Sequence, residues 1–186
     1  MRKPAVYAGM ALAAAMLTAQ APAAFFIDVP FVHQPKEGCG AAALAMVMQY
    51  WDGQAAHANS AAAVPADHDV ASIQEALYSP HDHGITASSM QSYLEQHGFR
   101  VFALNGTWDD LEQHLRKGRP LIVAIRPDGQ RALHYVVLDG LDTARGLVMM
   151  NDPGERKLLT EERTSFEKVW KATHNWLLLA VPAAAH

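Results

Sequence analysis

The stretch HQPKEGCGAAALAMVMQYWDG, residues His33 to Gly53, decides the fold, because it places the single cysteine of the chain before an alanine-rich run. Cys39 stands between two glycines at the head of that run. The apolar side chains that follow recur at the helical spacing i, i+3, i+4 and i+7: Leu44, Val47, Met48 and Trp51. Because Gly53 is a typical helix stop, we expect a helix with one apolar face and with Cys39 in its first turn.

Composition and charge describe one ordinary globular domain. Half of the 186 residues are apolar and 18% are charged, which supplies enough apolar material for a full core. The formal net charge is -4, with acidic and basic residues interspersed and no run of lysine or arginine. Nucleic acid and anionic membrane surfaces are therefore not expected as partners.

The first 24 residues have the pattern of a secretory signal peptide. Arg2 and Lys3 precede an uncharged segment rich in alanine and leucine, and small residues suited to cleavage follow it. The alternative is an uncleaved membrane anchor, but Gln20 and Pro22 shorten the apolar span below the ~20 residues that a bilayer requires. We therefore predict a signal peptide at 1–24 and an exported domain at 25–186, periplasmic or extracellular. No cysteine lies near the cleavage region, which excludes lipoprotein attachment.

Further elements follow from apolar periodicity, capping residues and turn signals along the chain. We expect helices over 70–78, 87–97, 108–117 and 164–171, and extended segments or strands over 26–31, 99–104, 120–125, 133–141, 146–151 and 176–181. The expected helix caps are Asp67 or Asp69, Thr86 and Thr107, and residues 54–66 are expected to form a surface loop. Helices cluster early and strands late, which predicts an α+β domain with a mostly antiparallel sheet.

A β-hairpin in the second half of the chain is predicted to bring two polar side chains together. With its loop centred on Thr143, His134 lies opposite Asp152, and directly opposed residues have Cβ atoms ~4.5 to 5.5 Å apart. Pro153 favours an extended backbone at Asp152 and ends the ladder just after it. The hairpin therefore predicts an imidazole beside the carboxylate that orients it.

The predicted pairing of His134 with Asp152 indicates a chemical role for Cys39. At a helix N-terminus the dipole and the free backbone N–H groups favour the thiolate of Cys39, and a neighbouring imidazolium favours it further. Gly38 and Gly40 are expected to leave open space around the sulfur for a substrate backbone. Upstream, the amide N–H₂ of Gln34 and the backbone N–H of Cys39 suit the oxyanion of a tetrahedral intermediate. The residues required for acyl transfer are thus present.

These motifs resemble those of the bacteriocin-processing, double-glycine peptidases, which are papain-like cysteine peptidases. The resemblance rests on Gln34 followed by GCGAAALAM at 38–46, on LHYVV at 133–137, and on NDP at 151–153. Weaker matches are GIT at 84–86, GRPLIV at 118–123 and FEKVW at 166–170. The likeness therefore spans nearly all of the chain that follows the predicted signal peptide.

The resemblance implies a fold, an activity and a set of roles. The fold is papain-like, with the nucleophile on an N-terminal helix that packs on the sheet. Cys39 is implied to be the nucleophile, His134 the general base and acid, Asp152 the group that orients the imidazole, and Gln34 an oxyanion-hole donor. The chemistry needs no cofactor or metal.

The expected partner is a peptide or small protein that serves as substrate. Family members best known for removing leader peptides are fused to an ABC exporter. This sequence contains no Gly-x-x-x-x-Gly-Lys-Ser/Thr phosphate loop and carries an export signal instead. We therefore expect no ATP as a partner, and a membrane only if the N-terminal segment is not cleaved.

Three classes of function are compatible with these residues. The first is an exported cysteine peptidase. The second applies the same acyl-enzyme chemistry to another amide, as a cell-wall amidase or a transpeptidase does. The third is a peptide-binding module on the same fold, against which the complete set of four residues argues, because binding alone requires no nucleophile.

Two turns rich in histidine and aspartate raise a separate metal hypothesis: Asp67-His68-Asp69 and His81-Asp82-His83. Imidazole and carboxylate are ligands that suit zinc. Adjacent residues of one loop rarely converge on one ion, however, whereas aspartates commonly cap helices and turns. We interpret both segments as caps and solvated turns.

The signal-peptide interpretation predicts where the exported protein begins. N-terminal sequencing of protein recovered outside the cytoplasm should find a start near Phe25, because the small-residue cleavage sites end there. Recovery of chains that begin at Met1 in the membrane fraction would show an anchor instead.

Overall fold

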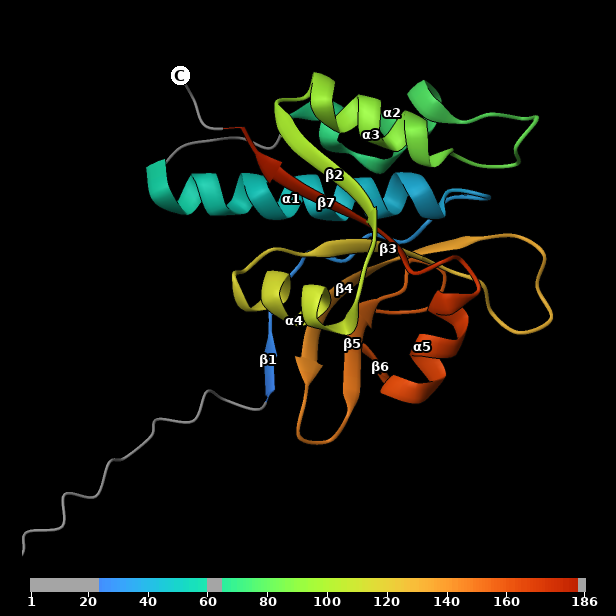
Figure 1. Cartoon of the computed structure of the whole chain (residues 1–186). Helices are drawn as coiled ribbons and strands as arrows, with labels where there is room; N and C mark the ends of the chain where they lie inside the picture. Colours follow the sequence, from blue (N-terminus) through green and yellow to red (C-terminus); the bar gives the residue numbers. More distant parts are fainter. Residues whose placement is uncertain (1–23, 60–64, 184–186) are drawn as a thin grey trace, which may run out of the picture.

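The computed structural model describes residues 24–59 and 65–183, which form helices and one antiparallel sheet (Figure 1). The helices are α1 (Cys39–Asn59), α2 (Val70–Leu77), α3 (Ala87–Gln96), α4 (Trp108–Arg116) and α5 (Arg163–Lys171), with a 3₁₀ turn η1 (Ala66–His68). The strands are β1 (Ala24–Phe26), β2 (Phe99–Asn105), β3 (Leu121–Ile125), β4 (His134–Asp142), β5 (Leu147–Asn151), β6 (Leu159–Glu162) and β7 (Trp176–Pro182). The expected α+β class with an antiparallel sheet is confirmed.

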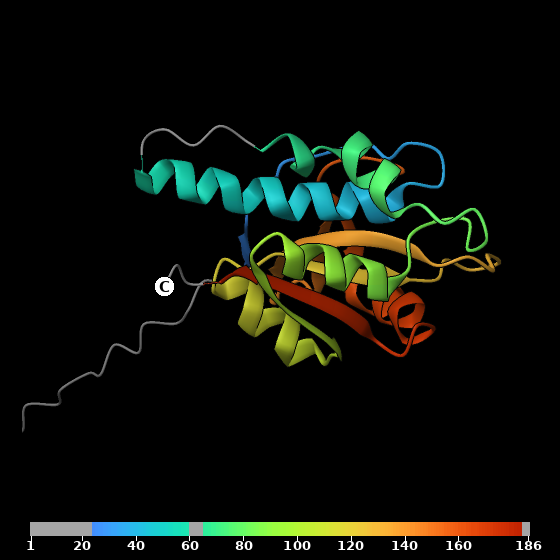
Figure 2. The ribbon, with the colours of Figure 1, turned by 90° about the horizontal axis from the view of Figure 1, so that it is seen from above.

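The sheet lies between two helical layers. Its strand order is β2-β7-β3-β4-β5-β6, and β1 pairs with β4 beside this path. Figure 1 and the view from above in Figure 2 place α1, with α2 and α3, on one side of the sheet and α4 and α5 on the other. The core is therefore divided between the two faces of β3 and β4, whose apolar residues are buried.

Helix α1 is buried on all sides over its first half. Every residue from Gly40 to Met48 is buried. The expectation of a helix with a single buried apolar face is therefore wrong for this half of α1. The alanines Ala41, Ala42, Ala43 and Ala45 have no exposed surface. Small side chains at these positions let the sheet on one side and α2 on the other approach the helix backbone.

The capping residues behave as the sequence predicts. Asp69 caps α2 by accepting hydrogen bonds from the backbone N–H groups of Ala71 and Ser72. Thr86 caps α3, and Thr107 forms a reciprocal capping box with Asp110 at the start of α4. These caps fix where three of the helices begin, to the residue that the sequence indicates.

Three expected boundaries are wrong. Helix α1 does not stop at Gly53 but continues to Asn59, because the Ala-rich turn that follows favours helix more than one glycine, at about 1 kcal/mol, opposes it. The expected loop at 54–66 is therefore helical at its start, and its residues 60–64 lie outside the described part. The first strand is Ala24–Phe26 rather than 26–31. The strand β6 was not expected, since its sequence, LTEE, is short and acidic.

The β4–β5 hairpin forms, but in a different register from the one centred on Thr143. Near the loop, Asp142 pairs with Leu147 and Gly140 with Met149. Beyond a bulge at Asp139, Leu138 pairs with Met150 and Val137 with Asn151. The bulge inserts one residue into β4, and a shift of one residue exchanges the two faces of a strand. Without this insertion, His134 and Asp152 would lie on opposite faces of the sheet.

The side chain of the bulge residue is a buried carboxyl group. Asp139 has no exposed surface, and neither carboxyl oxygen has a hydrogen-bond partner among the described residues. Its backbone oxygen accepts a hydrogen bond from Ile27 N–H. Burial raises the pKa of Asp139 to about 7, and Asp28 also raises it while Lys157 opposes the shift. The folded protein therefore holds a proton here that the unfolded chain releases near pH 4.

This carboxyl group makes stability depend on pH in a defined direction. Between about pH 4 and pH 7 the folded state binds more protons than the unfolded state, so the free energy of unfolding falls as pH rises through this window. Asp139→Asn removes the ionisation, and its free energy of unfolding should fall less over the same window, by about 2 to 4 kcal/mol. Urea unfolding at several pH values measures the difference.

The control for this substitution is Asp128→Asn. Asp128 is an exposed carboxylate that pairs with Lys168, so its loss should leave the pH slope of stability close to that of the wild type. Parallel pH profiles for wild type and Asp139→Asn would contradict the assignment of the shifted group.

Candidate active site

Cys39 is the first residue of α1, and its thiol is partly buried at the N-terminal end of that helix. The loop before it closes with a hydrogen bond from Gly38 N–H to Pro35 O at 3.0 Å. The first turn of α1 contains no acidic residue. The positive end of the helix dipole therefore acts on the sulfur without opposition from a carboxylate on the same turn.

His134 and Asp152 meet at one edge of the sheet. His134 begins β4 and Asp152 follows the last residue of β5. His134 Nε2 and Asp152 Oδ1 are 2.7 Å apart, and Gly154 N–H donates to the same oxygen at 2.8 Å. Because Nε2 is engaged by Asp152, Nδ1 is the nitrogen left for the hydrogen bond between His134 and Cys39. The expected imidazole–carboxylate contact thus exists, diagonally across the hairpin and not between directly opposed residues.

The protonation tendencies of the three groups agree with one another. Burial opposes charge on each of them, but hydrogen bonds with His134 and with the backbone of Tyr135 and Gly40 outweigh it and lower the pKa of Cys39. Against its own burial, His134 has its pKa raised to about 9 by Asp152 and Cys39. The pKa of Asp152 is also lowered despite burial, because His134 donates to it. Together these shifts favour a thiolate, an imidazolium and a carboxylate in a row.

Gln34 lies beside the carboxylate end of this row. Its backbone N–H donates to Pro153 O at 3.0 Å, and a Cβ placed on Gly154 would lie 3.6 Å from Gln34 Nε2. Its Oε1 is buried and has no hydrogen-bond partner among the described residues. The backbone thus brings Gln34 to the same edge of the sheet as His134 and Asp152, and its role at an oxyanion stays a prediction.

A family model for Peptidase_C39-like proteins matches residues 26–177 of the chain. The chain belongs to the Peptidase_C39-like family. The match covers both Cys39 and the β4–β5 hairpin, so it includes all four residues that the sequence singles out. No curated protein sequence matches the chain.

Solved structures with the same fold are peptidase domains of this class. The peptidase domain of Streptococcus ComA, a bi-functional ABC transporter involved in a quorum-sensing pathway, is 21% identical, with a TM-score of 0.61 over 82% of this chain and 97% of that domain. A putative C39-like peptidase from Bacillus anthracis is 18% identical, with a TM-score of 0.56 over 86% and 98%. The Streptococcus mutans ComA domain is 17% identical, with a TM-score of 0.56 over 82% and 98%. At these identities the likeness establishes the fold.

The glycines that flank Cys39 in this C39-like chain serve packing, which corrects the expectation that they leave open space. Both are buried. A Cβ at Gly38 would lie 2.4 Å from Pro35 Cγ, and a Cβ at Gly40 would lie 3.1 Å from Ile85 Cβ. Glycine at these positions therefore lets the preceding loop and the turn before α3 approach Cys39 closely.

Sequence reasoning missed Tyr135 as part of the site. Its backbone forms a hydrogen bond to the Cys39 sulfur, and its buried ring lies beside Gly40, 3.6 Å from where a Cβ would stand. Its pKa is raised to about 12 by burial and by the nearby thiolate, so the phenol stays neutral. The position directly after the catalytic histidine candidate was the only available signal.

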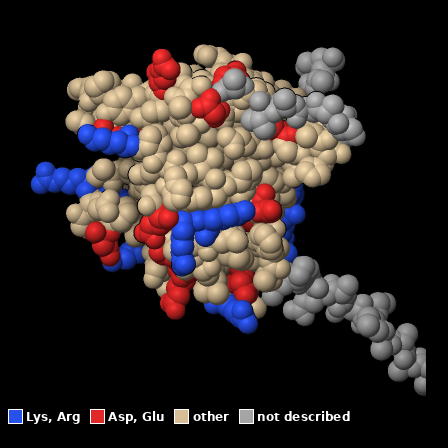
Figure 3. Space-filling view, turned by 180° about the vertical axis from the view of Figure 1, so that it is seen from behind, with Lys and Arg blue, Asp and Glu red and all other residues tan. Residues whose placement is uncertain are grey.

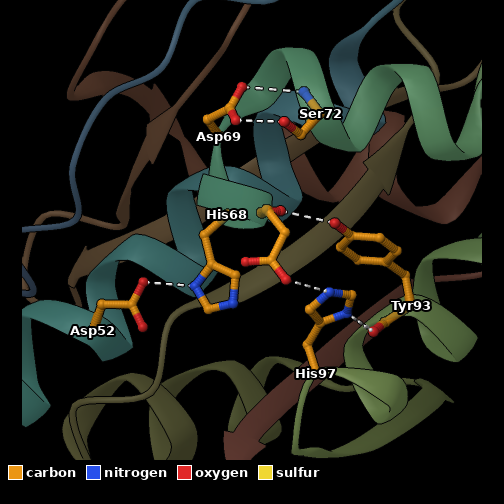
Figure 4. Close-up of polar contacts among 7 residues, drawn as sticks. Asp52, His68, Asp69, Ser72, Tyr93 and His97 are labelled. Carbon is orange, nitrogen blue, oxygen red and sulfur yellow. Dashed lines mark hydrogen bonds and ion pairs between the residues drawn. The ribbon is translucent and has the colours of Figure 1, made fainter. Parts of the chain in front are cut away.

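The first of the two turns behind the metal hypothesis is engaged in capping and pairing (Figure 4). Asp69 caps α2, His68 Nδ1 lies 2.6 Å from Asp52 Oδ2, and His97 Nε2 lies 3.0 Å from Asp67 Oδ2. In the second turn, Asp82 accepts from the Ser79 hydroxyl. Over residues 24–59 and 65–183, no three His, Cys, Asp or Glu side chains are grouped so as to hold a metal ion.

The lowered pKa of Cys39 predicts fast alkylation at mildly acidic pH. Iodoacetamide should react with Cys39 near pH 6 much faster than with an exposed cysteine of ordinary pKa, about 8.5. His134→Ala removes the imidazolium, so the rate at pH 6 should fall at least about tenfold and the pH profile should move upward. Mass spectrometry of the alkylated chain against time measures both rates.

The matched control is His81→Ala, which removes an exposed histidine from the turn before α3. It should leave the alkylation profile unchanged. A wild-type thiol that reacts only above about pH 8 would contradict the thiolate assignment.

Proposed function

We propose that this chain is an exported cysteine peptidase that hydrolyses a peptide bond through an acyl-enzyme on Cys39. The observation that carries the proposal is the hydrogen-bonded row of Cys39, His134 and Asp152 at the N-terminal end of α1. Membership of the Peptidase_C39-like family supports the same chemistry. A nucleophile, a base and a group that orients the base form the minimal arrangement for this reaction.

The first half of the reaction forms a thioester. The Cys39 thiolate attacks the carbonyl carbon of the scissile bond, and negative charge develops on the carbonyl oxygen. His134, protonated at Nδ1, gives this proton to the leaving nitrogen as the C–N bond breaks. Asp152 holds the imidazole ring in position from Nε2, where the carboxylate is 2.7 Å away.

The second half of the reaction returns the free enzyme. Neutral His134 takes a proton from a water molecule at Nδ1, the resulting hydroxide attacks the thioester, and Cys39 leaves as thiolate. In both halves the oxyanion is held by the backbone N–H of Cys39 and, in this proposal, by the side-chain amide of Gln34. The N–H groups of the first helical turn lack intrahelical acceptors, so the Cys39 N–H is available for this task.

The proposed surroundings of the enzyme follow from its N-terminal sequence and surface. None of the helices in the described ranges is long and apolar enough to cross a membrane. On the face drawn in Figure 3, the charged side chains of both signs are interspersed. The proposed location outside the cytoplasm rests on the signal peptide predicted at residues 1–24.

Substitution of each of the four residues tests the proposed roles. Cys39→Ala and His134→Ala should reduce peptide hydrolysis to nearly the same floor, because nucleophile and base act as one unit. Gln34→Ala should lower kcat by about 10² to 10³ while Cys39 stays reactive toward iodoacetamide. Asp152→Asn should be the mildest change, because an amide oxygen still accepts from the imidazole. Initial rates on a peptide pool, followed by mass spectrometry, measure these effects.

The control is Gln130→Ala, which removes an exposed glutamine from the loop after β3. It should hydrolyse the pool at the wild-type rate. Wild-type turnover by Gln34→Ala would refute the oxyanion role, and wild-type turnover by His134→Ala would refute the whole mechanism.

A further inference from the structure

A tight turn separates the two proposed oxyanion donors. Gln34 stands directly before this turn and Cys39 directly after it, and the turn closes with the hydrogen bond from Gly38 N–H to Pro35 O at 3.0 Å. Gly38 O in turn accepts a hydrogen bond from Ala42 N–H at 3.0 Å, as the residue before a helix does. The conformation of the turn therefore determines how the side chain before it and the first N–H of α1 lie relative to each other.

The third residue of the turn has a backbone conformation that does not suit its side chain. Glu37 has a φ of 55°, in the left-handed region that residues other than glycine, asparagine and aspartate rarely adopt. A turn with positive φ at its third position ordinarily has glycine there. We therefore expect the side chain of Glu37 to make contacts that offset the strain.

Two side chains hold the carboxylate of Glu37. The Tyr78 hydroxyl donates to Glu37 Oε2, and His83 Nδ1 lies 3.6 Å from Glu37 Oε1. The hydrogen bond from Tyr78, and then the nearby His83, lower the pKa of Glu37 against its partial burial. The same hydrogen bond raises the pKa of Tyr78. These two contacts form a clasp, in which the carboxylate stays an acceptor and the phenol stays a donor.

Both partners in the clasp belong to firmly held parts of the fold. Tyr78 is the residue at which α2 ends, and α2 packs against α1. His83 lies in the turn that leads to α3, which Ser79 and Gly84 close with hydrogen bonds in both directions, at 2.9 and 3.3 Å. That turn also reaches the backbone of Glu37, since a Cβ on Gly84 would lie 3.8 Å from Glu37 O. The clasp thus fastens the turn before α1 to elements outside it.

We infer that Glu37 is a positioning residue for the oxyanion hole: its clasped carboxylate holds the turn that sets the Gln34 amide against the Cys39 N–H. The inference rests on the proposed function and adds to it a residue that acts only through its neighbours. A misplacement of about 1 Å can cost about 10²-fold in rate. Release of the clasp should therefore lower kcat but leave the thiolate unchanged, because His134 lowers the pKa of Cys39 from another part of the fold.

Two reactions of Cys39 separate the oxyanion hole from the thiolate. In reversible binding of the peptide aldehyde acetyl-glycyl-glycinal, Cys39 Sγ bonds to the aldehyde carbon, and the aldehyde oxygen takes the proton from His134 Nδ1. The product is a hemithioacetal, whose oxygen lies where the oxyanion forms. Iodoacetamide alkylation gives a thioether by displacement of iodide and uses no oxyanion donor. Aldehyde affinity compared with alkylation rate therefore measures the placement of the donors.

Substitutions at the clasp should weaken aldehyde binding selectively. Tyr78→Phe removes the hydroxyl donor, and Glu37→Ala removes the carboxylate while the unfavourable φ remains. Each should weaken aldehyde binding and lower kcat on the peptide pool by about 10- to 100-fold, with KM and the iodoacetamide rate within about threefold of the wild type. Glu37→Gly also loses the clasp but adopts positive φ without strain, so it should bind the aldehyde about tenfold more tightly than Glu37→Ala.

A double variant tests whether Tyr78 acts through Glu37. Tyr78→Phe combined with Glu37→Gly should bind the aldehyde as Glu37→Gly alone does, because the hydroxyl then has no carboxylate to hold. The matched control is Tyr93→Phe, which removes a tyrosine hydroxyl outside the clasp that donates to Asp67 O at 2.7 Å (Figure 4). It should keep the aldehyde affinity and the alkylation rate of the wild type.

The outcomes separate this inference from the proposed function. Wild-type aldehyde affinity in Tyr78→Phe and Glu37→Ala would overturn the positioning role, as would equal losses from Tyr78→Phe with and without Glu37→Gly. A parallel fall in the iodoacetamide rate, or a wild type that does not bind the aldehyde, would overturn it too. The expected affinities without cleavage of any peptide would leave the positioning role standing and overturn the peptidase; cleavage with equal affinities in all variants would do the reverse.

Discussion

The enclosure of the first half of α1 is the constraint on which the rest of the structure depends. A helix with neighbours on every side cannot shift or rotate without opening voids or overlapping with side chains, because protein interiors are close-packed. The alanines of this run fix how near the sheet and α2 come. The N-terminal end of α1 is thereby held at one place on the sheet edge, and Cys39 is held with it.

The second requirement is that the sheet presents His134 and Asp152 at that same place. The hairpin loop alone would direct them to opposite faces, and the extra residue at Asp139 reverses this. Gly140, next to the bulge, accommodates β1 so closely that a Cβ there would lie 2.7 Å from Phe25 O. The buried carboxyl group of Asp139 and the closely packed Gly140 thus lie side by side at the bulge in β4, which brings His134 and Asp152 to the same face of the sheet. Such local irregularities are typical of strands near functional sites.

The sequence was sufficient for features that depend on local chemistry and insufficient for those that depend on tertiary contacts. Asp69, Thr86 and Thr107 were identifiable because a capping side chain acts within three residues of itself. The end of α1 was not identifiable, because the tendency of Gly53 to end a helix competes with the helix preference of the residues that follow it. The bulge at Asp139 could not be predicted, because the apolar pattern of the two strands is nearly the same with and without it.

For the candidate site, the contact between His134 and Asp152 was predictable, but the reasons for several neighbouring residues were not. The hydrogen bond between His134 and Asp152 forms as expected, although the pairing that was expected to produce it does not occur. Gly38 and Gly40 were singled out from the sequence, but the reason for them was not predictable. They are required by the close approach of Pro35 and Ile85, whose positions in space the sequence pattern does not give. Tyr135 contributes through its backbone, which no side-chain pattern reveals.

The distance along the chain between Cys39 and His134 determines when the thiol becomes reactive. One lies at the start of α1 and the other at the start of β4, with α2, α3, α4 and two strands between them. Contacts of such long range form only when most of the fold is in place, since the entropy of closing the intervening chain must first be overcome. An unfolded chain therefore carries a cysteine of ordinary reactivity, because the imidazole that activates the thiol is not yet beside it. The lowered pKa of Cys39 is thus a property of the folded chain and not of the local sequence around the cysteine.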